Sequence, residues 1–163
     1  MQEQSQTEVL ARVNASLGRR VLGLTALSLL GILVIYVALA KPPALVWRVF
    51  LIGLGAGALW LADSMRRATS EVIELTETEL RDTSGEVIAR VADIESIDRG
   101  FFAFKPSNGF LLKTRTPGLR IWRPGLWWRM GRRIGVGGMT PGHQTKVMSE
   151  IIAALMARRD GDI

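Results

Sequence analysis

The sequence predicts an α+β membrane protein in which two apolar helices precede a small β-rich domain and a final helix. Val21–Ala40 is an uncharged run of 20 residues, which is about the length that a helix needs to cross the hydrocarbon core of a bilayer. A second apolar run, Ala44–Ala62, follows after a short connection. Beyond Ser70 the apolar residues alternate with polar ones, and turn-forming residues recur at short intervals. That pattern is typical of antiparallel sheets.

The connection between the two runs contains Pro42 and Pro43, which do not continue a helix, so the two helices are expected to form an antiparallel hairpin. Lys41 lies in the connection and Arg48 at its edge, whereas the outer ends carry more basic residues: Arg12, Arg19, Arg20, Arg66 and Arg67. The positive-inside rule then places both termini in the cytoplasm and the hairpin in the cytoplasmic (inner) membrane. A signal peptide cleaved after Ala40 is the alternative for the first run, but a second apolar run follows at once.

Gly53 and Gly57 form a G-x-x-x-G pattern in the second apolar run. Small residues at this spacing let helices approach closely in lipid. The pattern is compatible with a contact between two copies of the chain or with packing of the two helices of the hairpin. We favour packing within the hairpin, because the pattern is common in membrane helices.

Composition limits the chemistry of the chain. No cysteine is present and His143 is the one histidine, so disulfides, thiolate metal sites and cysteine nucleophiles are excluded and no metal site or cofactor is predicted. The formal net charge is +6, yet Glu71–Asp98 is rich in acidic residues and 99–149 contains none. We find no pair of acid–base residues that defines a cleft, so we expect a protein that is not an enzyme.

The β-rich region is expected to form a compact antiparallel barrel or sandwich. The expected strands are Val72–Thr76, Leu80–Arg81, Val87–Val91, Ile94–Asp98, Phe101–Lys105, Phe110–Thr114, Leu119–Trp122 and Trp127–Val136. Turns are expected at 82–85, 106–109, 116–118 and 123–125. Thr140 and Pro141 predict the start of a last helix, as N-cap and first helical residue. Its apolar stripe is expected to cover the open end of the barrel: Val147, Met148, Ile151, Ile152, Leu155 and Met156. Apolar residues at helical spacing in Met1–Gly18 predict a short amphipathic helix there, or an extension of the first span.

Six or seven short antiparallel strands followed by one helix resemble the pleckstrin-homology-like superfold, whose bacterial versions are often attached to two transmembrane helices. The resemblance covers about Glu71–Arg158 and is based on the order of the elements. Together with the two apolar runs, it predicts a cytoplasmic segment at 1–18, a transmembrane hairpin at 19–65, a pleckstrin-homology-like domain at 71–159 and a tail at 160–163. In eukaryotic lipid-binding members a basic pair flanks the first hairpin. Here that hairpin, near Asp82–Gly85, lies in the acidic half, so recognition of phosphoinositides by the familiar pocket is not implied.

One stretch interleaves tryptophan with arginine and is the candidate lipid- or partner-binding site: Arg120, Trp122, Arg123, Trp127, Trp128, Arg129, Arg132 and Arg133. Tryptophan favours the membrane–water boundary and arginine binds phosphate in bidentate fashion. The alternative is structural, because strand alternation turns Trp122 and one of the two adjacent tryptophans into the core and leaves the arginines solvated or paired with the acidic strands.

These observations predict a non-enzymatic membrane protein that acts through its cytoplasmic β-domain as a membrane-anchored interaction or assembly module. Its expected partners are the lipid bilayer and either another membrane protein or a second copy of the chain. The alternative is a module that binds anionic lipid headgroups through the tryptophan–arginine stretch. Nucleic acid is not expected as a partner, since a domain tethered to a membrane rarely meets it.

Overall fold

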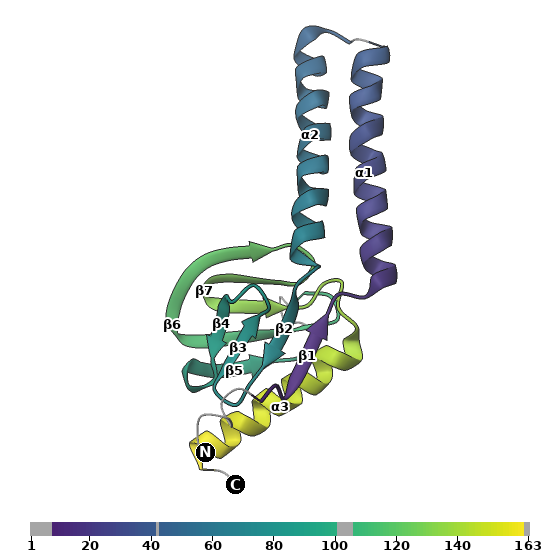
Figure 1. The fold of residues 1–163 in the computed structure, drawn as a ribbon. Coiled ribbons are helices and arrows are strands. Elements are labelled where there is room, and N and C mark those ends of the chain that lie inside the picture. Colours follow the sequence, from purple (N-terminus) through teal and green to yellow (C-terminus); the bar gives the residue numbers. More distant parts are fainter. Residues whose placement is uncertain (1–7, 42, 101–105, 162–163) are drawn as a thin grey trace.

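A helical hairpin projects from a β-rich domain, and a C-terminal helix lies along that domain on the side away from the hairpin (Figure 1). The computed structural model describes residues 8–41, 43–100 and 106–161. The elements in chain order are β1 (Ala11–Asn14), α1 (Leu17–Ala40), α2 (Leu45–Ala68), β2 (Val72–Leu75), β3 (Glu79–Asp82), β4 (Val87–Arg90), the 3-10 turn η2 (Val91–Asp93), β5 (Ile94–Asp98), β6 (Phe110–Arg123), β7 (Trp127–Val136) and α3 (Gly142–Asp160).

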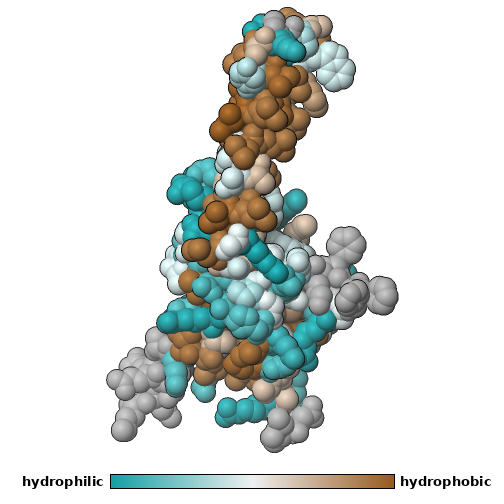
Figure 2. Space-filling view, turned by 90° about the vertical axis from the view of Figure 1, so that its right-hand side faces the viewer, coloured by the Kyte–Doolittle hydropathy of each residue, from teal (hydrophilic) through white to brown (hydrophobic). Residues whose placement is uncertain are grey.

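Helices α1 and α2 are the two predicted apolar helices. Each has 24 residues and is long and apolar enough to cross a membrane, with a mean hydropathy of 2.5 for α1 and 1.8 for α2 over their most apolar windows. At about 1.5 Å per residue, 24 residues extend about 36 Å. Apolar side chains face outward along most of the hairpin, which forms a continuous hydrophobic column above a largely hydrophilic domain (Figure 2). This surface suits lipid better than water.

The two helices touch through Gly31 of α1 and Gly55 of α2. A Cβ atom at Gly55 would lie 2.8 Å from the carbonyl oxygen of Gly31, so only glycine fits at this crossing. Nothing lies within 4 Å of the corresponding positions at Gly53 and Gly57. The expectation that Gly53 and Gly57 pack the hairpin is therefore wrong. Successive helical residues are rotated by about 100°, so Gly55 faces away from its neighbours two positions before and after.

The expected N-terminal helix is also wrong, because Ala11–Asn14 forms strand β1. This strand pairs antiparallel with β2, with Ala11 opposite Leu75 and Asn14 opposite Val72, and the side chain of Val13 is fully buried. The helical hairpin is thus inserted between two paired strands. Its connections are only two and three residues long, Ala15–Ser16 and Thr69–Glu71, and the N–H of Ser16 donates to the Met139 carbonyl at 2.7 Å.

The strands form two sheets, in the orders β1-β2-β3-β4 and β5-β6-β7, and do not close into the expected barrel. The expected strands from Val72 to Asp98 are confirmed within one or two residues, while Phe101–Lys105 lies outside the described residues. Strand β6 continues through 116–118, where a turn was expected. Its pairing with β7 shifts register between Lys113 and Gly118, so Pro117 falls outside the regular ladder, as a residue without an N–H requires.

Inward-facing side chains of both sheets and of α3 form one core. Met148 and Ile152 of α3 are fully buried, whereas Val147 of the predicted stripe is half exposed. Helix α3 packs against β1, η2, β5 and β6 and so covers the core between the sheets. It begins one residue later than predicted, with Pro141 as its N-cap, because the Thr140 hydroxyl donates instead to the Asn108 carbonyl at 3.3 Å.

Candidate functional site

The tryptophan–arginine stretch forms the far end of the β6–β7 hairpin. Strand β6 curves around the domain, so its last residues lie beside the lower end of α2 (Figure 1). The turn after β6 contains Gly125 at φ 85°, where a Cβ atom would lie 3.0 Å from Cγ2 of Thr69. The turn therefore lies close against the base of the helices, where a side chain larger than glycine would meet Thr69.

Trp127 belongs to the core and is not available for binding. Its side chain is 1% exposed, and its indole N–H donates to Oδ2 of Asp82 at 3.2 Å. The other oxygen, Oδ1, accepts from the backbone N–H groups of Ser84 and Glu86 at 3.1 and 3.2 Å. The buried carboxylate is satisfied, and the bond joins β7 to β3, which lies in the other sheet. Core packing is therefore confirmed for Trp127, whereas Trp122 is exposed.

Arg129 also has a structural role, because it bridges the two sheets. Its Nε donates to the Leu119 carbonyl at 2.8 Å, and its Nη1 donates to the carbonyls of Val87 and Ile88, both at 3.1 Å. Nη2 pairs with Glu86 at 3.3 Å. Val87 and Ile88 lie on β4, which pairs with β3 and with no other strand in the described part of the chain. The Arg129 guanidinium thus donates to two β4 carbonyls that a neighbouring strand would otherwise bind. In this way it helps to hold the two sheets together although they do not close into a barrel.

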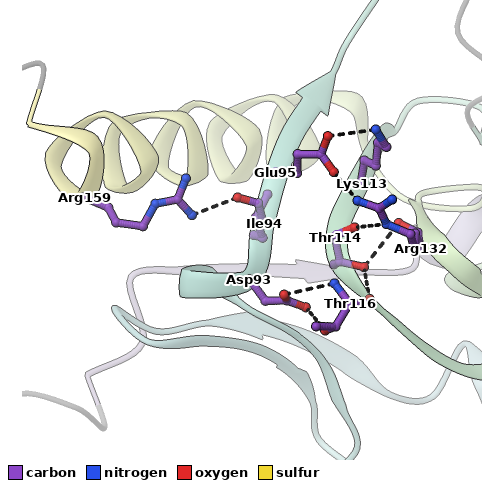
Figure 3. A network of polar contacts seen from close by, with 8 residues as sticks. All are labelled: Asp93, Ile94, Glu95, Lys113, Thr114, Thr116, Arg132 and Arg159. Carbon is purple, nitrogen blue, oxygen red and sulfur yellow. Dashed lines mark hydrogen bonds and ion pairs between the residues drawn. The ribbon is translucent and has the colours of Figure 1, made fainter.

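A polar network on β5, β6 and β7 uses Arg132 (Figure 3). Nε of Arg132 donates to the Thr114 carbonyl at 2.8 Å, and Nη2 donates to Oε2 of Glu95 at 2.6 Å. Lys113 donates to the other oxygen of Glu95 at 2.8 Å. The Lys113 hydrogen bond, with the charges of Lys113, Arg132 and Arg115, holds the pKa of Glu95 below its usual range. The expected pairing of arginines with the acidic strands is confirmed for Arg129 and Arg132.

Three of the predicted residues, Arg120, Trp122 and Trp128, form with Leu119 and Met130 what we call the hairpin-tip surface. Trp122 lies directly opposite Trp128 in the β6–β7 register, and with Arg120 and Met130 they line a hollow of about 290 Å³. Leu119, Trp122 and Met130 are 80%, 55% and 50% exposed. Sequence analysis missed Leu119 and Met130. Numbering the strand pairs outward from the turn at Gly125 would have placed Met130 opposite Arg120.

Arg123 and Arg133 do not belong to the hairpin-tip surface. Arg123 is half-buried, and its Nε is a buried donor without a partner among the described residues. Arg133 is exposed, but it lies on the other side of Gly131, where β7 takes a positive φ of 60° and the pairing with β6 changes register. The structure therefore separates the eight predicted residues into core, bridging and exposed groups.

Further basic residues surround the base of the helices. Nη2 of Arg20 donates to the Arg66 carbonyl and Nη1 of Arg19 to the Thr140 carbonyl, both at 3.4 Å. On α2, Asp63 pairs with Arg66 at 2.8 Å and with Arg67 at 3.0 Å. Four arginines thus lie at the level where the hydrophobic column meets the domain.

Within the described ranges, no group of three or more His, Asp or Glu side chains is placed to hold a metal ion, and His143 is exposed at the start of α3. Acidic side chains of the first sheet pair with arginines, as Glu74 does with Arg12 at 3.1 Å and with Arg81 at 3.6 Å. Comparison with protein families, curated proteins and solved structures finds no match for this chain.

Proposed function

We propose that this protein is a non-enzymatic, membrane-anchored interaction module whose β-domain rests on the membrane surface through the hairpin-tip surface. The observation that carries the proposal is the exposure of three apolar side chains, Leu119, Trp122 and Met130, on the β6–β7 hairpin. The turn of this hairpin packs against the base of two helices that are long enough to span a bilayer. Exposed apolar side chains gathered at one place mark a contact surface.

The chemistry of this surface fits the zone between lipid headgroups and acyl chains. Tryptophan prefers that depth, and a cation near an anionic membrane contributes about 1 kcal/mol. Arg120 lies within the surface, and Arg66 and Arg67 lie in the last turn of α2. With one arginine in a shallow hollow, the surface favours anionic lipid in general over one particular headgroup. A specific headgroup site in the hollow beside Trp122 is the second candidate.

The order of the elements supports a pleckstrin-homology-like domain with the helical hairpin inserted between β1 and β2. Four strands, then three strands and a final helix are the order that this superfold implies, once β1 is counted with the domain. The arginines at the base of the hairpin outnumber Lys41 and Arg48 near its turn. By the positive-inside rule, the β-domain and both termini then face the cytoplasm from the inner membrane.

The chain has no cysteine, so single cysteines allow a direct test of this contact. We would attach nitroxide labels to Met130→Cys and, as a matched control, to Ala154→Cys on the exposed face of α3, far from the hairpin. In nanodiscs containing phosphatidylglycerol, the label at 130 should collide with oxygen and be shielded from an aqueous nickel chelate, and the label at 154 should behave in the opposite way. Equal exposure of both labels to the chelate would contradict the proposal.

The preference for anionic lipid has its own test. Shielding of the label at 130 should decrease in nanodiscs made of phosphatidylcholine alone, and Arg120→Glu should decrease it further. Shielding that persists unchanged in both cases would assign the contact to apolar insertion alone and remove the role of charge.

A further inference from the structure

An open groove of about 630 Å³ separates the two sheets beside Arg129. Its walls are residues 87–90 of β4 on one side and 114–118 of β6 on the other. On the β4 side the sheet ends, because β3 is the one described strand that pairs with β4. On the β6 side, pairing with β5 ends at Thr114 and regular pairing with β7 resumes at Gly118. The groove therefore runs between two strand segments that each have an unoccupied side.

The backbone of Arg90 faces this groove. The N–H of Val91 donates to the Thr78 carbonyl at 2.9 Å, and the next pair in the ladder is Arg90 with Glu79. Hydrogen-bonded and non-hydrogen-bonded pairs alternate in an antiparallel ladder. The N–H and the carbonyl of Arg90 consequently point away from β3, toward the free side of β4.

Two arginine side chains donate hydrogen bonds to the backbone carbonyls on either side of Arg90. Arg129 donates to Val87 and Ile88, as described above. At the other end, Nη1 of Arg159 donates to the carbonyls of Val91 and Ala92 at 3.1 and 3.2 Å. Between these two caps, the N–H and carbonyl of Arg90 have no backbone partner among residues 8–41, 43–100 and 106–161, and they have the arrangement that an added strand would use.

The groove is also cationic. Arg90 and Arg115 are exposed, and neither forms an ion pair within 4.0 Å in the described part of the chain. Arg115 lies close enough to Glu95 and Asp160 for its charge to lower the pKa of each, after larger contributions from their own partners. The Asp93 carboxylate does not neutralise the groove, because it accepts from the N–H and hydroxyl of Thr116 at 3.2 and 2.6 Å.

We infer that this groove binds an extended, acidic segment of a partner protein. The segment pairs its backbone with the N–H and carbonyl of Arg90, and its carboxylates pair with the guanidinium groups of Arg90 and Arg115. An added strand gains affinity from its backbone and specificity from alternate side chains. A phosphate-bearing ligand supplies charge but no backbone donor for the Arg90 carbonyl, so a peptide fits both features. The inference rests on the proposed interaction module and names the class of its partner.

The test uses the full chain in detergent micelles without added lipid and a displayed library of random octapeptides. The chain should enrich peptides with Asp or Glu at alternate positions, and the enriched peptide should bind the Arg90→Glu/Arg115→Glu variant at least ten times more weakly. That variant should itself enrich peptides with Lys or Arg. Exchange of the Arg90 amide hydrogen should slow when the enriched peptide is present.

A charge-matched variant distinguishes peptide binding in the groove from nonspecific attraction of acidic peptides to a basic protein. Arg133→Glu/Lys146→Glu makes the same change in charge at exposed positions outside the groove and should leave peptide affinity unchanged. Methylation of one backbone nitrogen at the centre of the enriched peptide should weaken binding about tenfold for at least one register of the methyl group.

Several results would overturn the inference. These are a library without acidic enrichment, equal losses in both double variants, methylated peptides that all bind as well as the parent, and displacement of the peptide by inorganic phosphate at equal charge concentration. Lipid is absent from the assay, so failure here leaves the nanodisc result at Met130 unaffected. Conversely, an exposed label at Met130 would contradict the membrane contact while peptide binding persisted.

Discussion

Replacing Arg129 with methionine tests whether a single guanidinium holds the two sheets together. The side chain is 12% exposed and donates to three carbonyls on two strand segments, Leu119 on β6 and Val87 and Ile88 on β4. Hydrogen bonds that involve a charged group contribute about 1.5–3 kcal/mol each. The three are not additive, and water in the open groove will solvate part of what is lost. We expect Arg129→Met to destabilise the β-domain by about 3 kcal/mol, within the range for breaking a buried charged contact.

The measurement is the free energy of unfolding from urea titration in mild detergent, followed by near-ultraviolet circular dichroism. Arg129→Lys provides a geometric test, because an ammonium group has no planar fork that reaches carbonyls on two strand segments, and it should recover less than half of the loss. Arg133→Met is the matched control on the same strand and should stay within about 0.5 kcal/mol of the parent. Full stability in Arg129→Lys would refute the argument from fork geometry, and full stability in Arg129→Met would refute the bridge itself.

Three further outcomes are expected. Trp127→Phe should cost about 2–3 kcal/mol in the same titration, since it shrinks a core side chain and removes the donor to Oδ2 of Asp82; a change below 1 kcal/mol would count against this bond. Gly55→Val should lower the midpoint of unfolding of the helical hairpin in sodium dodecyl sulfate, whereas Gly57→Val should not, and the reverse order would show that the crossing is misplaced. The pKa of Glu95 is lowered in the folded state, so the Glu95 carboxylate stabilises the fold fully above its ordinary pKa and less as pH falls through the lowered value. The difference in free energy of unfolding between the parent and Glu95→Gln should be largest near pH 7 and vanish at acid pH. A difference independent of pH would contradict the ion pair of Glu95.

The sequence predicted the features that depend on composition and local pattern. Two apolar runs of sufficient length predicted α1 and α2, and the turn residues 123–125 predicted the connection between β6 and β7. Apolar residues at helical spacing obscured β1, because the partner that makes Ala11–Asn14 a strand lies beyond both helices. Such a pairing is non-local, so no pattern within the first 18 residues specifies it.

The candidate site was predicted in location but not in the roles of its members. Alternation predicted that Trp122 and one of the two adjacent tryptophans would be buried, which is confirmed for Trp127 and wrong for Trp122. The register shift between Lys113 and Gly118 changes which side of β6 faces inward. The role of Arg129 depends on the absence of a strand beside β4, which is a property of the assembled sheets. Gly118 is the one sequence feature that reflects the role of Arg129 in the described structure, because a Cβ atom at this position would lie 2.8 Å from Nε of Arg129.

The pairing of β1 with β2 has a consequence for biosynthesis. The ribosome releases β1 first, yet its neighbour in the sheet emerges only after the whole helical hairpin has been made. Until then β1 has no hydrogen-bonding partner, and a β2 without β1 exposes an unsaturated edge that invites aggregation. The β-domain can therefore fold completely only after both helices have been made and positioned. In a chain whose helices are misplaced, we expect the β-domain to stay incompletely folded and to be degraded by proteases.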